Sequence, residues 1–235
     1  MLRMGVIGVG SMGQNHARIY AEMGYLEGVY DAFAESAQRI SRKLDTTAYP
    51  DVISLLEKVD ALSICTPTTT HYETARQAIE MGRSVLVEKP FTGDVDRARE
   101  LCEMAEDKGV ALASGFVERF NPVVEATKNS LASGRFGSVV SIASRRVSSF
   151  PSRIRDVGVV MDLAIHDIDV IRHLSAKSIE SVYALGGKLA NDRFEDHAVI
   201  LLELEGGATG MVEVNWLTPM KVRNVTLTCS NGLAQ

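Results

Sequence analysis

Acidic and basic side chains recur on one stripe of a single predicted helix in the second half of the chain. Asp162, His166 and Asp169 fall at about 0°, 40° and −20° around a helix axis that turns 100° per residue, and His173 lies on the same stripe. A neutral imidazole can take a proton from a hydroxyl group, and these groups are costly to bury without a use. We therefore expect a proton-transfer site. A hydrogen-bonded structural network or a metal site would also explain the stripe, although no other His/Cys cluster completes a coordination shell, and we predict no metal.

A second pair of charged residues follows a short apolar run in the first half. Glu88 and Lys89 come directly after the run Ser84 to Val87, and Pro90 restricts the turn that follows. Ligands of parallel sheets bind beyond the carboxyl ends of the strands, where this pair would lie. A lysine there can donate to a reacting oxygen. Taken alone, Lys89 would be interpreted as an ordinary surface lysine.

Glycines at the N-terminus have the spacing of a dinucleotide-binding turn. The run Gly8-Val-Gly-Ser-Met-Gly13 follows a predicted strand and opens a predicted helix, whose N-terminus attracts phosphate. Asp31 follows 18 residues after Gly13, where a carboxylate can bind a ribose hydroxyl and disfavour the 2′-phosphate of NADP. We predict NAD as the preferred cofactor, with NADP as the alternative. A glycine-rich turn of another α/β protein is the competing interpretation. The residues expected to hold the cofactor here are Gly8, Gly10, Ser11, Met12, Gly13 and Asp31.

The elements that must position these residues alternate in the first half of the chain. Short apolar runs alternate with amphipathic segments, a pattern typical of βαβ units and a parallel sheet covered on both faces. The expected strands are 4–9, 27–31, 61–65, 84–87 and 110–115, and the expected helices are 11–23, 34–44, 72–81 and 94–108.

After Pro122 the pattern changes to an α+β arrangement. Strand-like runs joined by short polar turns predict an open, mainly antiparallel sheet. The expected helices are 123–131 and 159–174, and the expected strands are 138–147, 179–189, 197–205, 208–216 and 222–229. The fold class is therefore α/β, with a dinucleotide-binding domain over residues 1–120 and an α+β substrate and oligomerisation domain over residues 121–235.

Composition excludes several classes of protein. The 235 residues are 46% hydrophobic and 23% charged, which is typical of a globular chain, and the net charge of −5 argues against a general nucleic-acid binder. No apolar stretch reaches the roughly 18 residues of a membrane span, and the N-terminus lacks a signal-peptide pattern. Three cysteines without a CxxC pair favour a reducing compartment, so we expect a cytoplasmic protein without a membrane or nucleic-acid partner.

Taken together, the motifs resemble those of the Gfo/Idh/MocA oxidoreductases, in that family's order and spacing over most of the chain. They are GVIGVGSMG at residues 5–13, Thr66-Pro67, Glu88-Lys89-Pro90, GFVERFNP at residues 115–122, and the Asp162/His166 helix. The resemblance implies a Rossmann domain joined to an α/β domain whose open sheet commonly mediates oligomerisation. It also implies an NAD(P)-dependent enzyme that interconverts a hydroxyl and a ketone on a sugar or cyclitol. The run GFVERFNP is similar to that of UDP-N-acetylglucosamine 3-dehydrogenases.

The resemblance also implies a role for individual residues. Lys89 and His166 would form the acid/base pair at the substrate hydroxyl, and Asp162 would orient His166 or contact the substrate. Glu88 would lie near the nicotinamide ribose. Three further residues would line the cofactor cleft: Thr66, Pro67 and His71.

Several polar residues are candidates for binding the substrate. Arg145 and Arg155, with the arginines around them, could clamp a carboxylate or a nucleotide-sugar diphosphate, or form a solvated loop. Arg119 and Asn121 could reach the substrate cleft or lock the domain junction, and Asp169 belongs to the helix stripe described above.

The chain departs from the family at its C-terminus. It stops at Gln235, where relatives continue with further strands and helices, so we expect a natural short form or a missing segment. An exposed sheet would favour pairing with another copy, and hence a homo-oligomer. Two other functions remain open: a non-catalytic dinucleotide-binding or assembly protein derived from the family, and a dehydrogenase of a non-sugar substrate.

Overall fold

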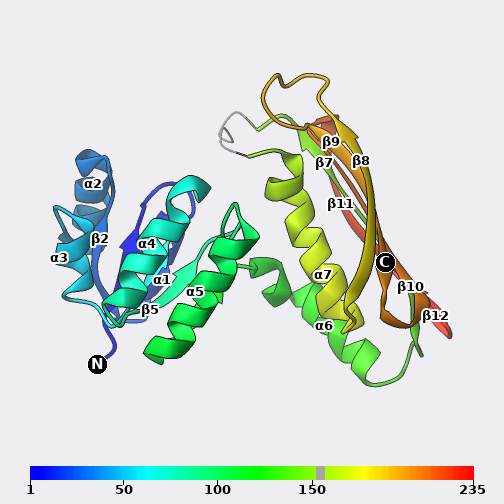
Figure 1. Ribbon diagram of the computed structural model, residues 1–235, viewed down its shortest axis with the longest axis horizontal. Coiled ribbons are helices and arrows are strands. Elements are labelled where there is room, and N and C mark those ends of the chain that lie inside the picture. Colours follow the sequence, from blue (N-terminus) through cyan, green and yellow to red (C-terminus); the bar gives the residue numbers. More distant parts are fainter. Residues whose placement is uncertain (152–156) are drawn as a thin grey trace. The chain divides into compact units, whose positions relative to one another are not determined.

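The chain folds into two compact units, Met1–Gly115 and Phe116–Gln235 (Figure 1). The computed structural model describes residues 1–151 and 157–235. One six-stranded sheet lies in each unit. The boundary between the units falls five residues before the predicted limit at residue 120.

The first unit is built on a parallel sheet in the order β3-β2-β1-β4-β5-β6. Chain order reverses between β1 and β4, and such a switch point opens a crevice at the carboxyl ends of the strands. The strands are β1 (Met4–Ile7), β2 (Leu26–Tyr30), β3 (Thr47–Ala48), β4 (Ala61–Ile64), β5 (Ser84–Val87) and β6 (Leu112–Ser114).

Helices cover both faces of this sheet and divide its core in two. Ala17, Ala37 and Ile40 pack with strand residues in one buried cluster, and Ile79 and Leu101 belong to another. This two-sided burial explains the nearly continuous apolar strands. The helices are α1 (Gly13–Glu22), α2 (Ala34–Leu44), α3 (Val52–Leu56), α4 (Thr68–Glu80) and α5 (Val95–Lys108).

Most of the predicted elements of the first unit are confirmed. The predicted bounds of α2 and β5 match the structure, whereas α4 begins at Thr68, four residues earlier than expected, directly after Pro67. Two short elements, β3 and α3, were not predicted from the sequence. Two and five residues are too few for an apolar period to be recognised, and α3 is stabilised locally by Asp51, whose carboxylate accepts the Ser54 N–H at 2.7 Å.

The second unit has a mixed, mostly antiparallel sheet in the order β12-β11-β7-β10-β9-β8. The predicted antiparallel character is confirmed, with one parallel pair, β7 with β10, at the centre. The strands are β7 (Val139–Ser149), β8 (Ile179–Gly187), β9 (His197–Leu204), β10 (Ala208–Asn215), β11 (Leu217–Cys229) and β12 (Gly232–Ala234).

A helical layer packs on one face of this sheet (Figure 1). The single helix predicted over 159–174 begins instead with a π-helical turn, η2 (Val160–Ala164), which continues into α7 (Ile165–Ser175). Such turns are rare and frequently occur at functional sites. The layer also contains a 3₁₀ turn, η1 (Val117–Phe120), and α6 (Pro122–Ala132), and a second 3₁₀ turn, η3 (Glu205–Gly207), joins β9 to β10.

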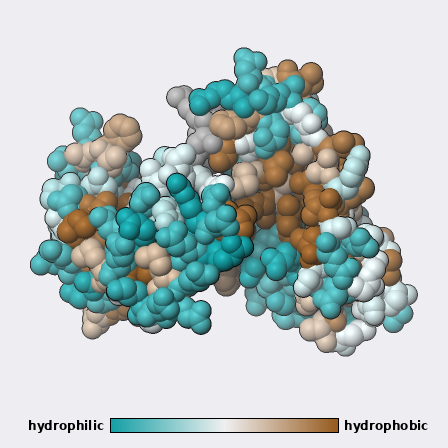
Figure 2. Space-filling model, in the orientation of Figure 1, coloured by the Kyte–Doolittle hydropathy of each residue, from teal (hydrophilic) through white to brown (hydrophobic). Residues whose placement is uncertain are grey.

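Successive side chains of β9 point to opposite faces of the second sheet. Ala198, Ile200 and Leu202 are buried in the core with α7, whereas Val199 and Leu201 are exposed on the other face. Hydrophobic side chains also gather over α7 and the neighbouring edge of the sheet on the side seen in Figure 2. The sheet therefore carries apolar residues on both faces, and within residues 1–151 and 157–235 helices cover one of these faces.

Candidate active site

Two glycines of the N-terminal turn are required by steric contact. Gly8 has φ +84°, and a Cβ on it would lie 2.9 Å from the backbone of Cys65. A Cβ on Gly13 would lie 1.7 Å from the carbonyl oxygen of Gly8. Only glycine fits at either position, so the tight turn and the close approach of α1 to the sheet follow directly from these two residues.

Gly10 differs because a Cβ there would meet no atom within 4 Å. The turn is thus open at its middle glycine and closed at the other two, which is the shape that admits a diphosphate to the backbone. Ser11 and Met12 are exposed beside Gly10, and α1 starts at Gly13 with its N-terminal amides toward the turn. These residues fit a dinucleotide cofactor.

Asp31 lies against the same turn. It follows β2, and its Oδ2 accepts the N–H of Val9 at 2.8 Å while its Oδ1 accepts the N–H of Phe33 at 2.9 Å. The carboxylate is therefore fixed beside the glycines by backbone donors on both sides. The predicted role of Asp31 at the ribose stays a prediction.

The segment after β4 is tied to the segment after β5 by His71. Its buried imidazole lies 2.8 Å from the carbonyl oxygen of Pro90 through Nδ1 and 2.8 Å from that of Thr66 through Nε2. Thr66 and Pro67 lie where β4 ends, at the carboxyl edge of the sheet. His71 therefore holds together the loop that follows β4 and the loop that follows β5. The contact of Thr66, Pro67 and His71 with the cofactor stays a prediction.

Glu88 is a buried carboxylate at the end of β5. Its Oε1 lies 3.0 Å from Nε2 of His16, and its Oε2 accepts the N–H of Lys89 at 3.2 Å. Burial raises the pKa of Glu88, but the hydrogen bond and charge of His16, with the Lys89 N–H, outweigh it and hold the pKa below its usual value. Gly115 leaves the space that this carboxylate occupies, since a Cβ there would lie 3.0 Å from it.

His16 was not among the site residues predicted from the sequence. Nδ1 of its ring lies 2.9 Å from Oγ of Ser63, which in turn is 2.6 Å from the hydroxyl of Tyr20. A polar chain thus runs from α1 across β4 to Glu88. The position of His16, three residues after Gly13 in the helix that the glycine turn opens, was the available signal.

In the second unit, the structure buries the predicted acid/base residues of the helix stripe. Asp162 lies in η2, and His166 and Asp169 lie in α7, all with little exposed surface. His173 is less buried and lies 3.2 Å from Nζ of Lys128. Burial, Lys128 and Arg119 lower the pKa of His173, which favours the neutral form of its imidazole.

The predicted substrate residues of the second unit have protein partners. Arg119 donates to both carboxylate oxygens of Asp169, and Asn121 begins α6 by accepting the Val123 N–H at 3.1 Å. Arg145 is exposed and pairs with Glu213 at 3.0 Å. Arg155 lies outside the described residues. The contacts of Arg119 and Asn121 all lie within the second unit. Both predicted roles of these residues, at the substrate and at the domain junction, stay predictions.

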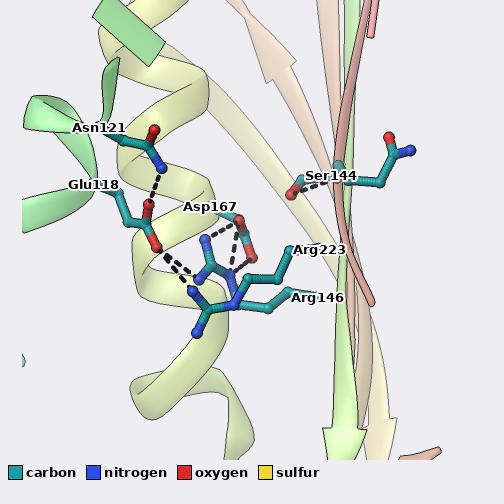
Figure 3. A network of polar contacts seen from close by, with 7 residues as sticks. Glu118, Asn121, Ser144, Arg146, Asp167 and Arg223 are labelled. Carbon is teal, nitrogen blue, oxygen red and sulfur yellow. Dashed lines mark hydrogen bonds and ion pairs between the residues drawn. The ribbon is translucent and has the colours of Figure 1, made fainter. Parts of the chain in front are cut away.

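A cluster of charged and polar side chains around the buried Arg146 lies beside α7 (Figure 3). Nε of Arg146 on β7 donates to Asp167 Oδ2 at 2.9 Å, and Nη1 donates to Glu118 Oε1 at 2.9 Å. Asn121 donates to the other oxygen of Glu118 at 3.2 Å, and Arg223 lies 3.7 Å from Glu118 Oε1. The cluster joins η1, β7, β11 and α7.

In the part of the chain that the structure describes, no group of three or more His, Cys, Asp or Glu side chains is arranged to hold a metal ion. Among the helices of the same residues, none is both long and apolar enough to cross a membrane.

Family models match each unit. The model described as "Oxidoreductase family, NAD-binding Rossmann fold" matches residues 2–116, and that described as "GFO/IDH/MocA C-terminal domain" matches residues 124–235. The two matches together cover nearly the whole chain and coincide with its two units.

Named relatives are dehydrogenases of sugars and cyclitols. The chain is 38% identical over 206 residues to the UDP-N-acetylglucosamine 3-dehydrogenase of Acidithiobacillus ferrooxidans, covering 88% of this chain and 64% of that protein. It is 30% identical over 233 residues to the scyllo-inositol 2-dehydrogenase (NAD(+)) of Bacillus subtilis, covering 93% of this chain and 68% of the relative. The chain thus spans about two thirds of the length of these relatives.

Solved structures agree with the sequence relatives. A structure of the Acidithiobacillus ferrooxidans enzyme matches with a TM-score of 0.90 and 34% identity, covering 97% of this chain and 74% of that one. The structure of GenD2 from gentamicin A biosynthesis, in complex with NAD, matches with a TM-score of 0.92 and 28% identity, covering 99% and 71%. Together with the glycine turn and Asp31, these findings show that the chain belongs to the Gfo/Idh/MocA family of NAD-binding oxidoreductases.

Proposed function

We propose that this protein is an NAD-dependent dehydrogenase that interconverts a hydroxyl and a ketone on a nucleotide sugar, sugar or cyclitol. The glycine turn, open at Gly10 and flanked by Asp31, is the observation that carries the proposal. The relatives named above supply the substrate class.

Bound NAD supplies the hydride acceptor for oxidation of a carbinol carbon. The open turn from Gly8 to Gly13 and the N-terminus of α1 hold its diphosphate, and Asp31 accepts hydrogen bonds from a ribose. The carboxylate of Asp31 also repels a 2′-phosphate, so we expect NADH to bind more tightly than NADPH.

Three side chains carry the proposed proton transfer. His166 accepts the proton of the substrate hydroxyl, Lys89 donates to the developing alkoxide, and Asp162 orients His166 or contacts the substrate. Glu88 holds the Lys89 backbone in place through the 3.2 Å hydrogen bond to its N–H. The remaining polar candidates in this proposal contact the substrate: Arg119, Asn121, Arg145, Arg155 and Asp169.

A nucleotide sugar is the favoured substrate, because the 38% identical relative acts on one. A cyclitol is the second candidate, since several relatives at 29–32% identity are inositol dehydrogenases. We further propose a cytoplasmic homo-oligomer that pairs through the open face of the second sheet. On that face Tyr183, Leu201 and Met211 form a cross-strand row with 63%, 46% and 41% of their surface exposed.

Titration of the purified chain with NADH and with NADPH, followed by nicotinamide fluorescence, tests the proposal. Saturable binding with preference for NADH is expected, followed by turnover with UDP-N-acetylglucosamine or an inositol. Lys89→Ala should reduce turnover far more than cofactor affinity. Unchanged turnover in that variant would exclude the role of Lys89, and cofactor binding without turnover on any such substrate would favour a non-catalytic dinucleotide-binding protein.

A further inference from the structure

The ion cluster around Arg146 holds the helix that carries His166 at a point next to that histidine. The guanidinium of Arg146 makes three hydrogen bonds to the carboxylate of Asp167, at 2.9, 3.0 and 3.1 Å. Asp167 directly follows His166 in the first turn of α7. Because successive residues of an α-helix are about 100° apart, fixing the direction of Asp167 fixes that of His166.

A second ion pair holds α7 on the other side of His166. Arg119 binds both oxygens of Asp169, which lies three residues after His166, or about −60° around the helix. Arg119 and Glu118 are neighbours in η1, and Glu118 binds the far side of Arg146. One 3₁₀ turn therefore fixes α7 at two positions on either side of His166, directly at Asp169 and through Arg146 at Asp167.

The local backbone explains why α7 needs such fixation. The π-helical turn η2 ends at Ala164, two residues before His166, and a π-helical turn departs from the regular α-helical register. Hydrophobic packing of Val170 and Ile171 against the sheet sets the depth of α7, but apolar contacts are not directional. Bidentate hydrogen bonds between a guanidinium and a carboxylate are directional.

The burial of the cluster argues against a role in stability alone. The side chains of Arg146 and Asp167 are 9% and 1% exposed, and burying an ion pair costs desolvation that hydrophobic residues would avoid. Arg146 and Arg223 also lie directly opposite each other on β7 and β11, where like charges repel unless a carboxylate such as Glu118 lies near both.

The electrostatics of Glu118 agree with its place near the helix. Burial raises the pKa of its carboxyl, but hydrogen bonds from Arg146 and Asn121, with the charges of Arg146 and His166, hold that pKa below its usual value.

We propose that Arg146 is a positioning residue, which together with Glu118 fixes the rotation of α7 and thereby the direction in which His166 is presented for proton transfer. This inference rests on the role proposed above for His166. It assigns no contact with substrate to Arg146.

Two conservative variants test the inference. Arg146→Lys keeps the positive charge but cannot form bidentate hydrogen bonds to Asp167. Glu118→Gln keeps the shape of the side chain but removes its negative charge. Glu125→Gln on α6, an exposed residue of the same unit, is the matched control. We expect Arg146→Lys and Glu118→Gln to lower kcat at least tenfold. Their KM should change less than threefold, and their Kd for NADH should stay within twofold of wild type. Glu125→Gln should behave like wild type in all three measurements.

A readout without turnover separates this inference from the proposed function. Diethyl pyrocarbonate modifies accessible histidines, and peptide mass analysis gives the rate at His166 relative to His197, whose side chain is 44% exposed. We expect the relative rate at His166 to rise at least fivefold in Arg146→Lys and in Glu118→Gln, even if no substrate is turned over. Variants that unfold at lower temperature but keep the wild-type rate at His166 and the wild-type kcat would show that the cluster only stabilises the fold, and would overturn the inference.

Discussion

The imidazole of His16 and the carboxylate of Glu88 are 3.0 Å apart, although 72 residues separate them in the chain. The pair joins the first turn of α1, which follows the glycines, to the end of β5, which precedes Lys89. The dinucleotide turn and the segment that carries Lys89 are thus connected within one unit by a part-buried contact.

Glu88→Gln is expected to lower the free energy of unfolding by about 1–3 kcal/mol at pH 7, because a charged hydrogen bond to His16 is lost. The pKa of Glu88 is lower in the folded chain than its usual 4.5, so this stabilisation is present above pH 4.5 and is lost as the pH falls through the folded value. Urea unfolding of both proteins at a series of pH values measures the difference.

The exposed Glu103 on α5 provides the control for this prediction, since Glu103→Gln removes the same charge without a buried partner. A difference between Glu88→Gln and wild type that stays constant from pH 7 down to the acid transition would contradict the assigned cause.

Alanine at two glycines of the same turn should have opposite effects. Gly13→Ala places a methyl group 1.7 Å from the Gly8 carbonyl oxygen and is expected to destabilise the unit strongly. Gly10→Ala meets no atom within 4 Å, so its unfolding midpoint should stay near that of wild type while NADH binding weakens at least tenfold. Thermal unfolding and nicotinamide fluorescence measure the two effects, and unimpaired binding by Gly10→Ala would place the diphosphate elsewhere.

Asp31→Asn is expected to weaken NADH binding about tenfold, or about 1.4 kcal/mol, and to reduce the preference for NADH over NADPH. The asparagine amide retains the shape of the side chain. It lacks the negatively charged carboxylate that accepts hydrogen bonds from the ribose and repels the 2′-phosphate of NADPH. Asp45→Asn at the end of α2 is a matched control, because asparagine tolerates the left-handed conformation found there, φ 51°. Equal Kd values for the two cofactors in wild type would overturn the assignment.

Asp196 is expected to confer resistance to acid on the second unit. Its buried carboxylate accepts the N–H groups of Leu189, Ala190 and Asn191 at 2.6–3.0 Å and pairs with His197. Burial acts to raise the pKa of Asp196, but these hydrogen bonds lower it to about 2 from 3.8. Its contribution, about 2 kcal/mol, is therefore present above pH 3.8 and is lost as the pH falls toward 2.

Asp196→Asn should accordingly unfold more readily than wild type at pH 7. The difference in the free energy of unfolding between the two proteins should disappear near pH 2. Circular dichroism during acid titration follows the transition, with Asp192→Asn, an exposed neighbour, as the reference. If both substitutions behave alike, the three backbone hydrogen bonds do not stabilise the loop as described.

Leu201→Lys tests the proposed pairing of copies through the second sheet. Leu201 is the middle of the exposed row with Tyr183 and Met211, and a buried lysine at an apolar interface is strongly unfavourable. Light scattering after gel filtration should show an oligomer for wild type and a smaller species for the variant. Leu201→Met keeps the apolar surface and should assemble as wild type; an identical mass for Leu201→Lys would exclude this face as the interface.

Local features of the sequence were sufficient to predict much of the fold. Residues close together in the chain determine the bounds of α2 and β5 and the shape of the glycine turn. The hydrophobic periodicity, the signals at helix ends and the steric limits of the backbone all act over such short distances. The position of Asp31 beside the glycine turn was predictable for the same reason, because one βαβ unit fixes the spacing between the first turn and the end of the second strand.

The tertiary structure alone decided the partners of the buried charges. Arg146 and Asp167 are 21 residues apart, and His16 and Glu88 are 72, so no local period relates them. The parallel pairing of β7 with β10 and the π-helical turn before α7 were likewise outside the reach of local pattern. The sequence by itself determined which residues could do chemistry, because residue type and spacing are local properties. Which of them are buried, paired and held in one direction depends on how distant segments pack, and that information exists only in the folded chain.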